Sequence, residues 1–364
     1  CSLVGSEMCI RDSVMDRVVQ EAVRQILEPV YEPTFHPSSH GFRPGRGAQT
    51  AIADVLRHQV EGKPFVVDID LSKFFDRVNH QRLLDRLGQR VTDRRVRRLV
   101  RLRLKASVVL PDGIVVSTEE GTPQGGPLSP LLSNIVLDEL DWELERRGLR
   151  FVRYADDFQV FVGSQRSGQR VMGSIRRFIE GRLRLRINEE KSAVARANRR
   201  AFLGFRVGVT RAGRPVVRLS RRSIDRLYSK IQELTPRNWG GPLKSCMSGV
   251  NRYLKGWAGY FRLCTNHEWK TLRELDCHTR RRLRAILVRQ KKRPRHLYRH
   301  LCQRVSRASA GRTAYSRRGI WWQSNSSGMQ RGYPNAWFAE HLLSLEKLCA
   351  RLRYDWRTLL GIAT

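Results

Sequence analysis

Residues 151–162 read FVRYADDFQVFV, two short apolar runs on either side of an acidic pair. Runs of this length and pattern predict two β-strands, and the short acidic segment between them predicts a hairpin with Asp156 and Asp157 at its tip. Asp is common in turns, so an isolated pair is more often a structural turn. The flanking strands weaken that interpretation, but spacing alone leaves both open.

A third carboxylate ends another apolar run, FVVDIDL at residues 65–71, which predicts a buried strand with Asp70 at its end. Asp68 points the same way as Asp70 if the strand alternates. Clustered carboxylates repel one another, and a bound divalent cation removes that cost. Mg²⁺ prefers carboxylate oxygens and substrate phosphates. Two such ions about 3.5–4 Å apart hold the attacking and leaving oxygens in phosphoryl transfer, which makes this chemistry a candidate.

The composition indicates a polyanionic partner. The 364 residues include 69 Lys and Arg against 34 Asp and Glu, a net charge of +35. Nucleic acid is the first candidate and an anionic membrane surface the second. Hydrophobic residues make up 40% of the chain, which excludes a wholly disordered protein. No apolar run is long enough to span a membrane. The seven cysteines contain no C-x-x-C pair, which favours reduced thiols over a zinc ribbon.

Apolar spacing predicts helices and strands in the first part of the chain and helices alone after about residue 220. The predicted helices cover residues 14–29, 48–60, 127–145 and 171–181, with two more between 80 and 105. The predicted strands are 65–71, a short one near Leu185, and the hairpins 108–116, 151–162 and 202–217. This pattern predicts an α+β unit followed by an all-α unit.

Six blocks resemble, in order, those of the group II intron reverse transcriptase/maturase family. The blocks are SHGFRPGR at 39–46, DLSKFFD at 70–76, GTPQGGPLSP at 121–130, YADD at 154–157, NEEK at 188–191 and FLGF at 202–205. The resemblance extends from Val14 to the C-terminus. It implies an α+β right-hand polymerase, with fingers and an antiparallel palm sheet, followed by an all-α basic thumb/maturase domain.

The resemblance also implies a domain division. We expect partial fingers and palm at 14–219, a thumb/maturase domain at 220–308 and a basic, aromatic nucleic-acid-binding segment at 309–364. Residues 1–13 resemble translated sequencing-adaptor sequence, so we expect a non-native leader, with a natural extension as the alternative. The family's first blocks should precede Val14, so we expect an N-terminally truncated enzyme that polymerises poorly. The chain's end resembles the endonuclease-lacking branch.

Catalytic roles follow from the resemblance, residue by residue. Asp70, Asp156 and Asp157 would bind two Mg²⁺ ions, with Mn²⁺ as a substitute, and Asp157 would be the less direct ligand. Asp68 would either support the metal ligands from behind or be structural. Lys191 would donate a proton to the pyrophosphate leaving group, with a plain surface lysine as the alternative.

The resemblance also implies a nucleotide pocket. Phe75 would be the steric gate that favours dNTPs over rNTPs, with a core aromatic as the alternative. Arg43 and Arg46 would contact triphosphate or template, because a guanidinium matches phosphate oxygens, although each alone is more often a solvated arginine. The pocket residues together are Leu71, Phe75, Gln124, Gly125, Arg43 and Arg46.

The C-terminal half carries basic and aromatic residues that suit RNA. Residues 253–261 read YLKGWAGYF, and residues 277–339 contain 16 Lys and Arg without any Asp or Glu. Such surfaces bind nucleic acid by stacking and by phosphate contacts. The alternative for most of the rings is helical core. The expected contacts are Tyr253, Lys255, Trp257, Arg280, Arg281, Arg282, Arg284, Lys291, Lys292 and Arg293.

The implied function is RNA-directed DNA synthesis on intron RNA together with maturase-type RNA binding. The partners would be group II intron RNA, template RNA, primer or target DNA and dNTPs, without a membrane, in the bacterial cytoplasm at the nucleoid. One alternative is an RNA-binding splicing cofactor that no longer polymerises. Another is a reverse transcriptase of retron, phage-defence or diversity-generating type. A membrane-surface protein is disfavoured because no amphipathic anchor segment stands out.

Overall fold

The structure is a computed structural model that describes residues 14–105, 108–109, 115–116, 120–121, 125–210, 213–264 and 269–352. The chain forms two compact units. Unit 1 contains the residues up to Phe202 and the segment Val207–Pro215, and unit 2 contains Leu203–Arg206 and the residues from Val216 onward. Unit 1 is α+β and unit 2 is almost entirely helical, as the sequence predicts.

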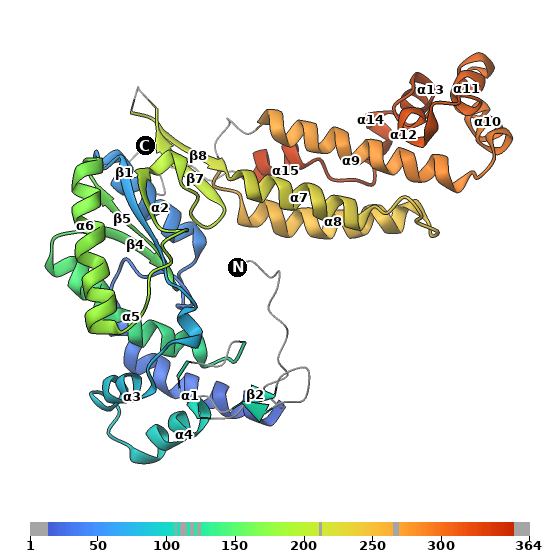
Figure 1. Ribbon diagram of the computed structural model, residues 1–364. Coiled ribbons are helices and arrows are strands. Elements are labelled where there is room, and N and C mark those ends of the chain that lie inside the picture. The colour runs from blue at the N-terminus through green and yellow to red at the C-terminus, as the bar shows by residue number, and fades with distance from the viewer. Residues whose placement is uncertain are drawn as a thin grey trace. The chain divides into compact units, whose positions relative to one another are not determined.

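A four-stranded antiparallel sheet forms the centre of unit 1, in the order β4-β5-β1-β6 (Figure 1). The strands are β1 (Phe65–Asp70), β4 (Arg150–Tyr154), β5 (Asp157–Val162) and β6 (Ala193–Arg196). The predicted hairpin at 151–162 is confirmed as β4 and β5. Each of these two strands is a short run of bulky residues that the sheet buries almost continuously, as a strand buried on both faces requires.

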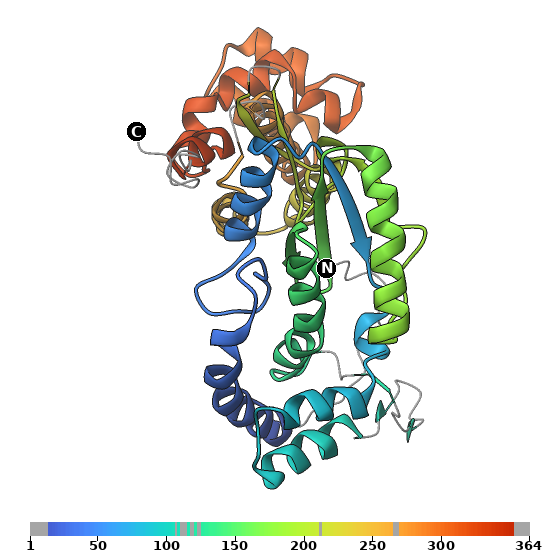
Figure 2. The ribbon, with the colours of Figure 1, turned by 90° about the vertical axis from the view of Figure 1, so that its left-hand side faces the viewer.

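The two faces of this sheet differ in chemistry. Val67, Ile69, Phe158 and Val160 belong to a buried core that also includes residues of α5 (Ser129–Arg146) and α6 (Gln165–Phe178). Figure 2 shows β1 as a blue arrow beside the green helix α6. The opposite face carries Asp68, Asp70, Asp157 and Gln159, since Asp68 pairs with Gln159 and Asp70 with Asp157 in the β1–β5 register. The sheet therefore presents a polar, acidic face at one end.

The other described elements of unit 1 agree well with the predicted pattern. The helices are α1 (Val14–Tyr31), α2 (Ala48–Val60), α3 (His80–Gly88) and α4 (Arg94–Leu104). The short helices are three 3-10 helices, η1 (Glu32–Thr34), η2 (Phe74–Asp76) and η4 (Ala197–Arg199), and the π-helix η3 (Ile179–Leu183). Strand β2 (Val108–Val109) pairs with β3 (Val115–Val116). The predicted strand near Leu185 is wrong, because that segment makes only an isolated bridge between Leu71 and Ile187. The fourth strand is β6, which was not predicted.

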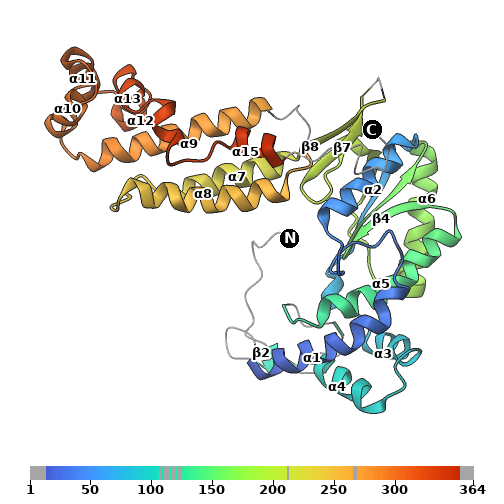
Figure 3. The same cartoon turned by 180° about the vertical axis from the view of Figure 1, so that it is seen from behind.

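Unit 2 begins with residues of a hairpin that the two units share, β7 (Phe205–Val209) and β8 (Pro215–Leu219). Three long helices, α7 (Arg221–Leu234), α8 (Leu243–Tyr260) and α9 (Trp269–Gln290), lie side by side (Figure 3). The remaining helices are α10 (Pro294–Cys302), α11 (Arg307–Ala314), α12 (Gly319–Gln323), α13 (Ser327–Gly332), α14 (Asn335–Ala339) and α15 (Leu345–Leu352).

One hydrophobic core holds unit 2 together. It includes Leu227, Met247 and Leu283 from the long helices and Ala310 and Phe338 from the later ones. The expected boundary at 308/309 therefore falls inside a single unit, because residues on both sides of it bury their side chains in the same core. Among the helices described, none combines the length and apolarity that crossing a bilayer requires.

Asp138 on α5 should make the stability of unit 1 depend on pH. Burial, helped by the negative charge of Asp141, raises its pKa from 3.8 to about 6. The native state thus holds this proton more tightly, so the stabilisation is present below about pH 4 and is lost as the pH rises through about 6. We expect the stabilising effect of Asp138→Asn to grow by about 1–3 kcal/mol between pH 4 and pH 7. Urea unfolding at both pH values measures it, and an equal effect at both would contradict the assignment.

Candidate functional site

The structure brings the three predicted carboxylates to one end of the sheet. Asp70 is the last residue of β1 and lies opposite Asp157, the first residue of β5. Tyr154 closes β4 and pairs with the same Asp157. Between them, Ala155 takes the left-handed conformation (φ 59°), which makes the tight turn that places Asp156 at the tip. The hairpin geometry thus joins residues that are 86 positions apart in the sequence, from Asp70 to Asp156.

The electrostatics of this site favour a cation. Burial and repulsion by the charges of Asp68, Asp156 and Asp70 raise the pKa of Asp157 to about 8. The pKa of Asp156 is raised as well, by burial and then by the charge of Asp70. A divalent cation would relieve this repulsion, and oxygen ligands of this kind suit Mg²⁺. The donor set therefore fits the predicted metal.

The three carboxylates do not by themselves form a complete metal-binding geometry. Across the described segments, no three Asp, Glu, His or Cys side chains are arranged as a ready-made metal site. Asp70 has a half-exposed side chain, 42% accessible, and the Nζ of Lys191 lies 3.9 Å from its Oδ2. The predicted catalytic lysine is thus beside the predicted catalytic carboxylate.

A buried arginine, which the sequence analysis missed, supports the hairpin tip. Arg153 on β4 and Asp141 on α5 are both fully buried, and Arg153 Nε donates to Asp141 Oδ1 at 2.7 Å. Arg153 Nη1 donates to the carbonyl of Ala155 and to Asn134 Oδ1, each at 2.9 Å. The guanidinium therefore fixes the turn that carries Asp156. The available signal was an arginine inside the strand, between Val152 and Tyr154.

The block at 39–46 packs its backbone against the same tip. A Cβ on Gly41 would lie 2.4 Å from the backbone nitrogen of Ala155, so only glycine fits there. Asn134 Nδ2 donates to the carbonyl of Gly41 at 2.9 Å, and the amide of His40 donates to the carbonyl of Arg153 at 2.9 Å. The glycine of this block is therefore explained by close packing on the candidate site.

The two arginines of that block have different surroundings. Arg43 is buried, and its guanidinium donates to the carboxylate of Glu32 at 2.9 Å and to the carbonyls of His36 and Ser39 at 2.7 and 2.9 Å. These bonds use the donors that a phosphate contact would need, so the surroundings of Arg43 favour a structural role. Arg46 donates to the carbonyl of Pro37 and stays half-buried.

The predicted nucleotide-pocket residues are only partly described. Phe75 is half-buried on η2, with its ring edge-on to Phe74 at 5.3 Å between centroids. Gly121 approaches it closely, since a Cβ there would lie 2.8 Å from the carbonyl oxygen of Phe75. Leu71 is a core residue at 4% exposure. Gly125 is exposed with a φ of 88°, whereas Gln124 lies outside the described residues.

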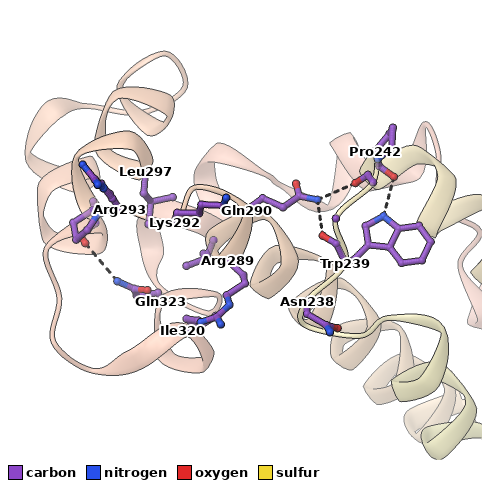
Figure 4. Close-up of a pocket in the computed structure, with 15 residues that line it drawn as sticks. Asn238, Trp239, Pro242, Arg289, Gln290, Lys292, Arg293, Leu297, Ile320 and Gln323 are labelled. Atoms are coloured by element: carbon purple, nitrogen blue, oxygen red, sulfur yellow. Dashed lines mark hydrogen bonds between the residues drawn. The ribbon is translucent and has the colours of Figure 1, made fainter.

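A basic groove of about 1000 Å³ lies within unit 2 (Figure 4). Its sides are the loop from Asn238 to Pro242, the C-terminal end of α9 and the start of α10. Gln290 ties two of these sides together, because its Nε2 donates to the carbonyls of Trp239 and Gly241 at 3.2 and 2.9 Å. Three exposed cations line the groove: Arg289, Lys292 and Arg293.

Several residues predicted to contact nucleic acid instead hold unit 2 together. Arg284 is buried and donates to the carbonyl of Tyr333 at 2.8 Å, and burial lowers its pKa to about 10. Arg282 donates to Thr235 Oγ1 at 2.6 Å, and Arg281 lies 4.0 Å from the ring centre of Trp321. For these three residues the predicted contact is unsupported, because the guanidinium groups are engaged inside the unit.

The aromatic stripe at 253–261 shows a similar division. Trp257 is 9% exposed and packs on Phe261 at 4.6 Å between ring centres, so it is a core residue and not a free stacking surface. Tyr253 is half-buried, and Lys255 is exposed. Arg280 and Lys291 are both half-buried, and Arg280 Nη2 lies 3.1 Å from the sulfur of Cys277. Of the predicted set, Lys255, Lys292 and Arg293 are exposed, and of these three Lys292 and Arg293 line the groove.

Comparisons with known proteins identify relatives of the chain. It is 30% identical over 248 residues to protein YkfC of Escherichia coli K12, covering 57% of this chain and 62% of that protein. It is 31% identical over 239 residues to the group II intron-encoded protein LtrA of Lactococcus lactis, covering 48% of this chain and 40% of LtrA. The solved structure of apo telomerase from Candida tropicalis is 12% identical, with a TM-score of 0.44, covering 94% of this chain and 57% of that one.

The chain spans less than two thirds of the length of YkfC, LtrA and the telomerase chain. Residues 9–207 match the family described as reverse transcriptase (RNA-dependent DNA polymerase). This match includes residues 9–13, part of the segment that we expected to be a non-native leader. Residues 224–305 match the group II intron maturase-specific domain. The chain therefore belongs to the reverse transcriptase family and carries a group II intron maturase-specific domain, as the sequence blocks indicated.

Proposed function

We propose that the protein is an RNA-directed DNA polymerase of a group II intron, which copies intron RNA into DNA. The observation that carries the proposal is the acidic end of the sheet, where Asp70 lies opposite Asp157 and Asp156 occupies the adjoining tip. The family match covers all three residues. The substrates would be dNTPs and a primer paired to template RNA. The match to the maturase-specific domain supports the intron lineage over the retron, phage-defence and diversity-generating types.

The reaction forms a bond between the primer 3′-oxygen and the α-phosphorus of a dNTP and breaks the bond to pyrophosphate. Asp70 and Asp156, with Asp157 behind them, would hold two Mg²⁺ or Mn²⁺ ions. Bound there, these ions would neutralise the charge on the reacting phosphate oxygens. The primer hydroxyl would lose its proton to solvent water, and Lys191 would give a proton to the departing pyrophosphate. Most of the acceleration would come from positioning and from charge stabilisation.

We also propose that unit 2 binds intron RNA and supports splicing. Its groove exposes Arg289, Lys292 and Arg293, and no acidic residue occurs in residues 277–339 to oppose them. Such a protein would act on RNA in the bacterial cytoplasm, at the nucleoid. The alternative is a splicing cofactor that binds RNA without polymerising.

Primer extension tests the polymerase directly. The purified chain is given poly(rA) template, oligo(dT) primer, Mg²⁺ and dTTP, and the same preparation is tested for splicing of its intron RNA. Extension of the primer supports the proposal. No extension, with tight and salt-sensitive RNA binding retained, contradicts the polymerase and leaves the splicing cofactor.

Removing the three groove cations should weaken RNA binding in a salt-dependent way. Each phosphate that a protein neutralises steepens the dependence of log K on log salt by about 0.7–0.9. We therefore expect the triple substitution of Arg289, Lys292 and Arg293 by Ala to reduce that slope by about 2. Filter binding of single-stranded RNA at several salt concentrations measures it. The matched control replaces three exposed α6 arginines, Arg166, Arg170 and Arg177. An equal loss in the control would show that only net charge matters.

A further inference from the structure

The loop that carries Lys191 is docked on the main chain of the catalytic strand. The amide of Asn188 donates to the carbonyl of Asp70 at 2.8 Å. The amide of Asp70 in turn donates to Ser192 Oγ at 3.1 Å. Two residues of the loop, on either side of Lys191, thus pair with both backbone groups of Asp70. These two hydrogen bonds therefore fix the position of the loop backbone relative to Asp70.

Arg200, nine residues after Lys191, links this loop to a distant residue of β1. Its Nε and Nη2 donate to Asp68 Oδ2 at 2.7 and 2.6 Å. The same Nη2 donates to the carbonyl of Lys191 at 2.6 Å. The other oxygen of Asp68 accepts from Gln159 Nε2 at 2.9 Å. A single chain of hydrogen bonds therefore runs from β5 through β1 to the backbone of Lys191.

We propose that Arg200 is a positioning residue, which holds the Lys191 loop so that the ammonium group of Lys191 stays at the carboxylate of Asp70. The Asp68 carboxylate is the anchor, because it is 8% exposed and lies two residues before Asp70 on the same face of the sheet. This inference rests on the proposed polymerase function, in which Lys191 supplies the proton to pyrophosphate.

A purely structural ion pair does not account for this arrangement. Asp68 and Arg200 already satisfy each other's charge, yet Nη2 also binds the carbonyl of Lys191. Lys191 has an exposed, flexible side chain with 67% accessibility, and its Nζ is 3.9 Å from Asp70. Fixing the backbone from which a long side chain extends reduces the conformations that the side chain must give up in the reaction. A planar guanidinium suits this role because its donors have a fixed geometry.

The experiment is a double-mutant cycle on single-turnover dNTP incorporation, with wild type, Arg200→Ala, Lys191→Ala and the double variant. We expect Lys191→Ala to lower the maximal rate about 100-fold and Arg200→Ala about 10-fold, with the apparent dNTP affinity nearly unchanged. Because Arg200 acts through Lys191, we expect the double variant to be no slower than Lys191→Ala. Arg200→Lys should recover part of the rate, since one ammonium can reach one of the two acceptors.

The control variant is Arg199→Ala, which removes an exposed arginine from the neighbouring position. It should leave the rate unchanged, so a loss equal to that of Arg200→Ala would overturn the inference. If the rate loss of the double variant equals the product of the two single losses, the two residues act independently and the inference is overturned. If Arg200→Ala does not fold, the same cycle is run with Arg200→Lys, where the charge of Asp68 remains paired.

Hydrogen exchange gives a second reading that does not depend on activity. In Arg200→Ala we expect the peptide spanning residues 186–195 to exchange about 10-fold faster, because the loop opens more often, while the β5 peptide stays protected. Unchanged exchange in residues 186–195 would overturn the positioning role. If the wild-type chain fails to extend primers and Arg200→Ala still shows this change in exchange, the proposed function is contradicted and the loop anchor stands.

Discussion

Replacing Asp156 by Ala is expected to abolish primer extension, with the rate of incorporation falling by about 10³-fold or more. Asp156 lies at the hairpin tip next to the Asp70–Asp157 pair, where the carboxylate charges repel one another. Under the proposed function, removing one carboxylate would leave the cation with fewer ligands and the reacting phosphates less well neutralised. Asp70→Ala should lower the rate of incorporation by as much, because Asp70 supplies the carboxylate opposite Asp157. Single-turnover incorporation on an RNA template, at several Mg²⁺ concentrations, measures both losses.

The matched control is Asp85→Ala, which removes an exposed carboxylate on α3. It should change the rate by less than about 2-fold, since a surface charge away from the site contributes little. Asp157→Ala should lower the rate of incorporation less than Asp156→Ala does. Asp157 is the first residue of β5 and was predicted to be the less direct ligand. Normal extension by Asp156→Ala would contradict the assignment of the metal site to this hairpin tip.

The strands that build this site could be predicted, because each is a short run of mostly bulky apolar residues. Residues 65–70 and the two runs within 151–162 form strands where expected. The fourth strand, β6, could not be predicted in the same way. It reads AVAR, with one bulky apolar residue, and it is a strand because it pairs with β1 along four residues. Tertiary pairing decides such a segment, and its own composition does not.

The sequence also could not predict which charged side chains point to the solvent and which point into the protein. A count of 16 cations without acids predicts a basic surface, but it does not distinguish Arg293, which is exposed, from Arg284, which is buried. Arg284 turns inward because the carbonyl of Tyr333, 49 residues further along the chain, accepts its donors. Arg153 is the same case in unit 1. Partners of this kind become visible only when the fold brings them together.

Breaking the buried Asp141–Arg153 pair is expected to have the largest effect on stability. Asp141→Leu leaves the guanidinium of Arg153 buried without its counter-charge, which typically costs about 3–5 kcal/mol. Both partners have no exposed side-chain surface, so water cannot replace the lost carboxylate. We expect unit 1 to unfold at a markedly lower urea concentration. Hydrogen exchange of the β4 and β5 peptides would measure the same loss of stability. The control Glu189→Leu breaks the exposed Arg176–Glu189 pair and should cost less than about 1 kcal/mol.

The double variant Asp141→Leu/Arg153→Met separates the stability of this pair from its use at the site. Replacing both charges by apolar side chains should recover most of the lost stability, because no unpaired charge stays buried. It should not recover catalysis, since the carbonyl of Ala155 and Asn134 Oδ1 both lose the donor that Arg153 supplies. We expect incorporation about 10-fold slower than wild type in a chain of near-normal stability. Recovery of both properties would show that the hairpin tip holds Asp156 without Arg153, and recovery of neither would show that the packing around the pair matters more than its charge.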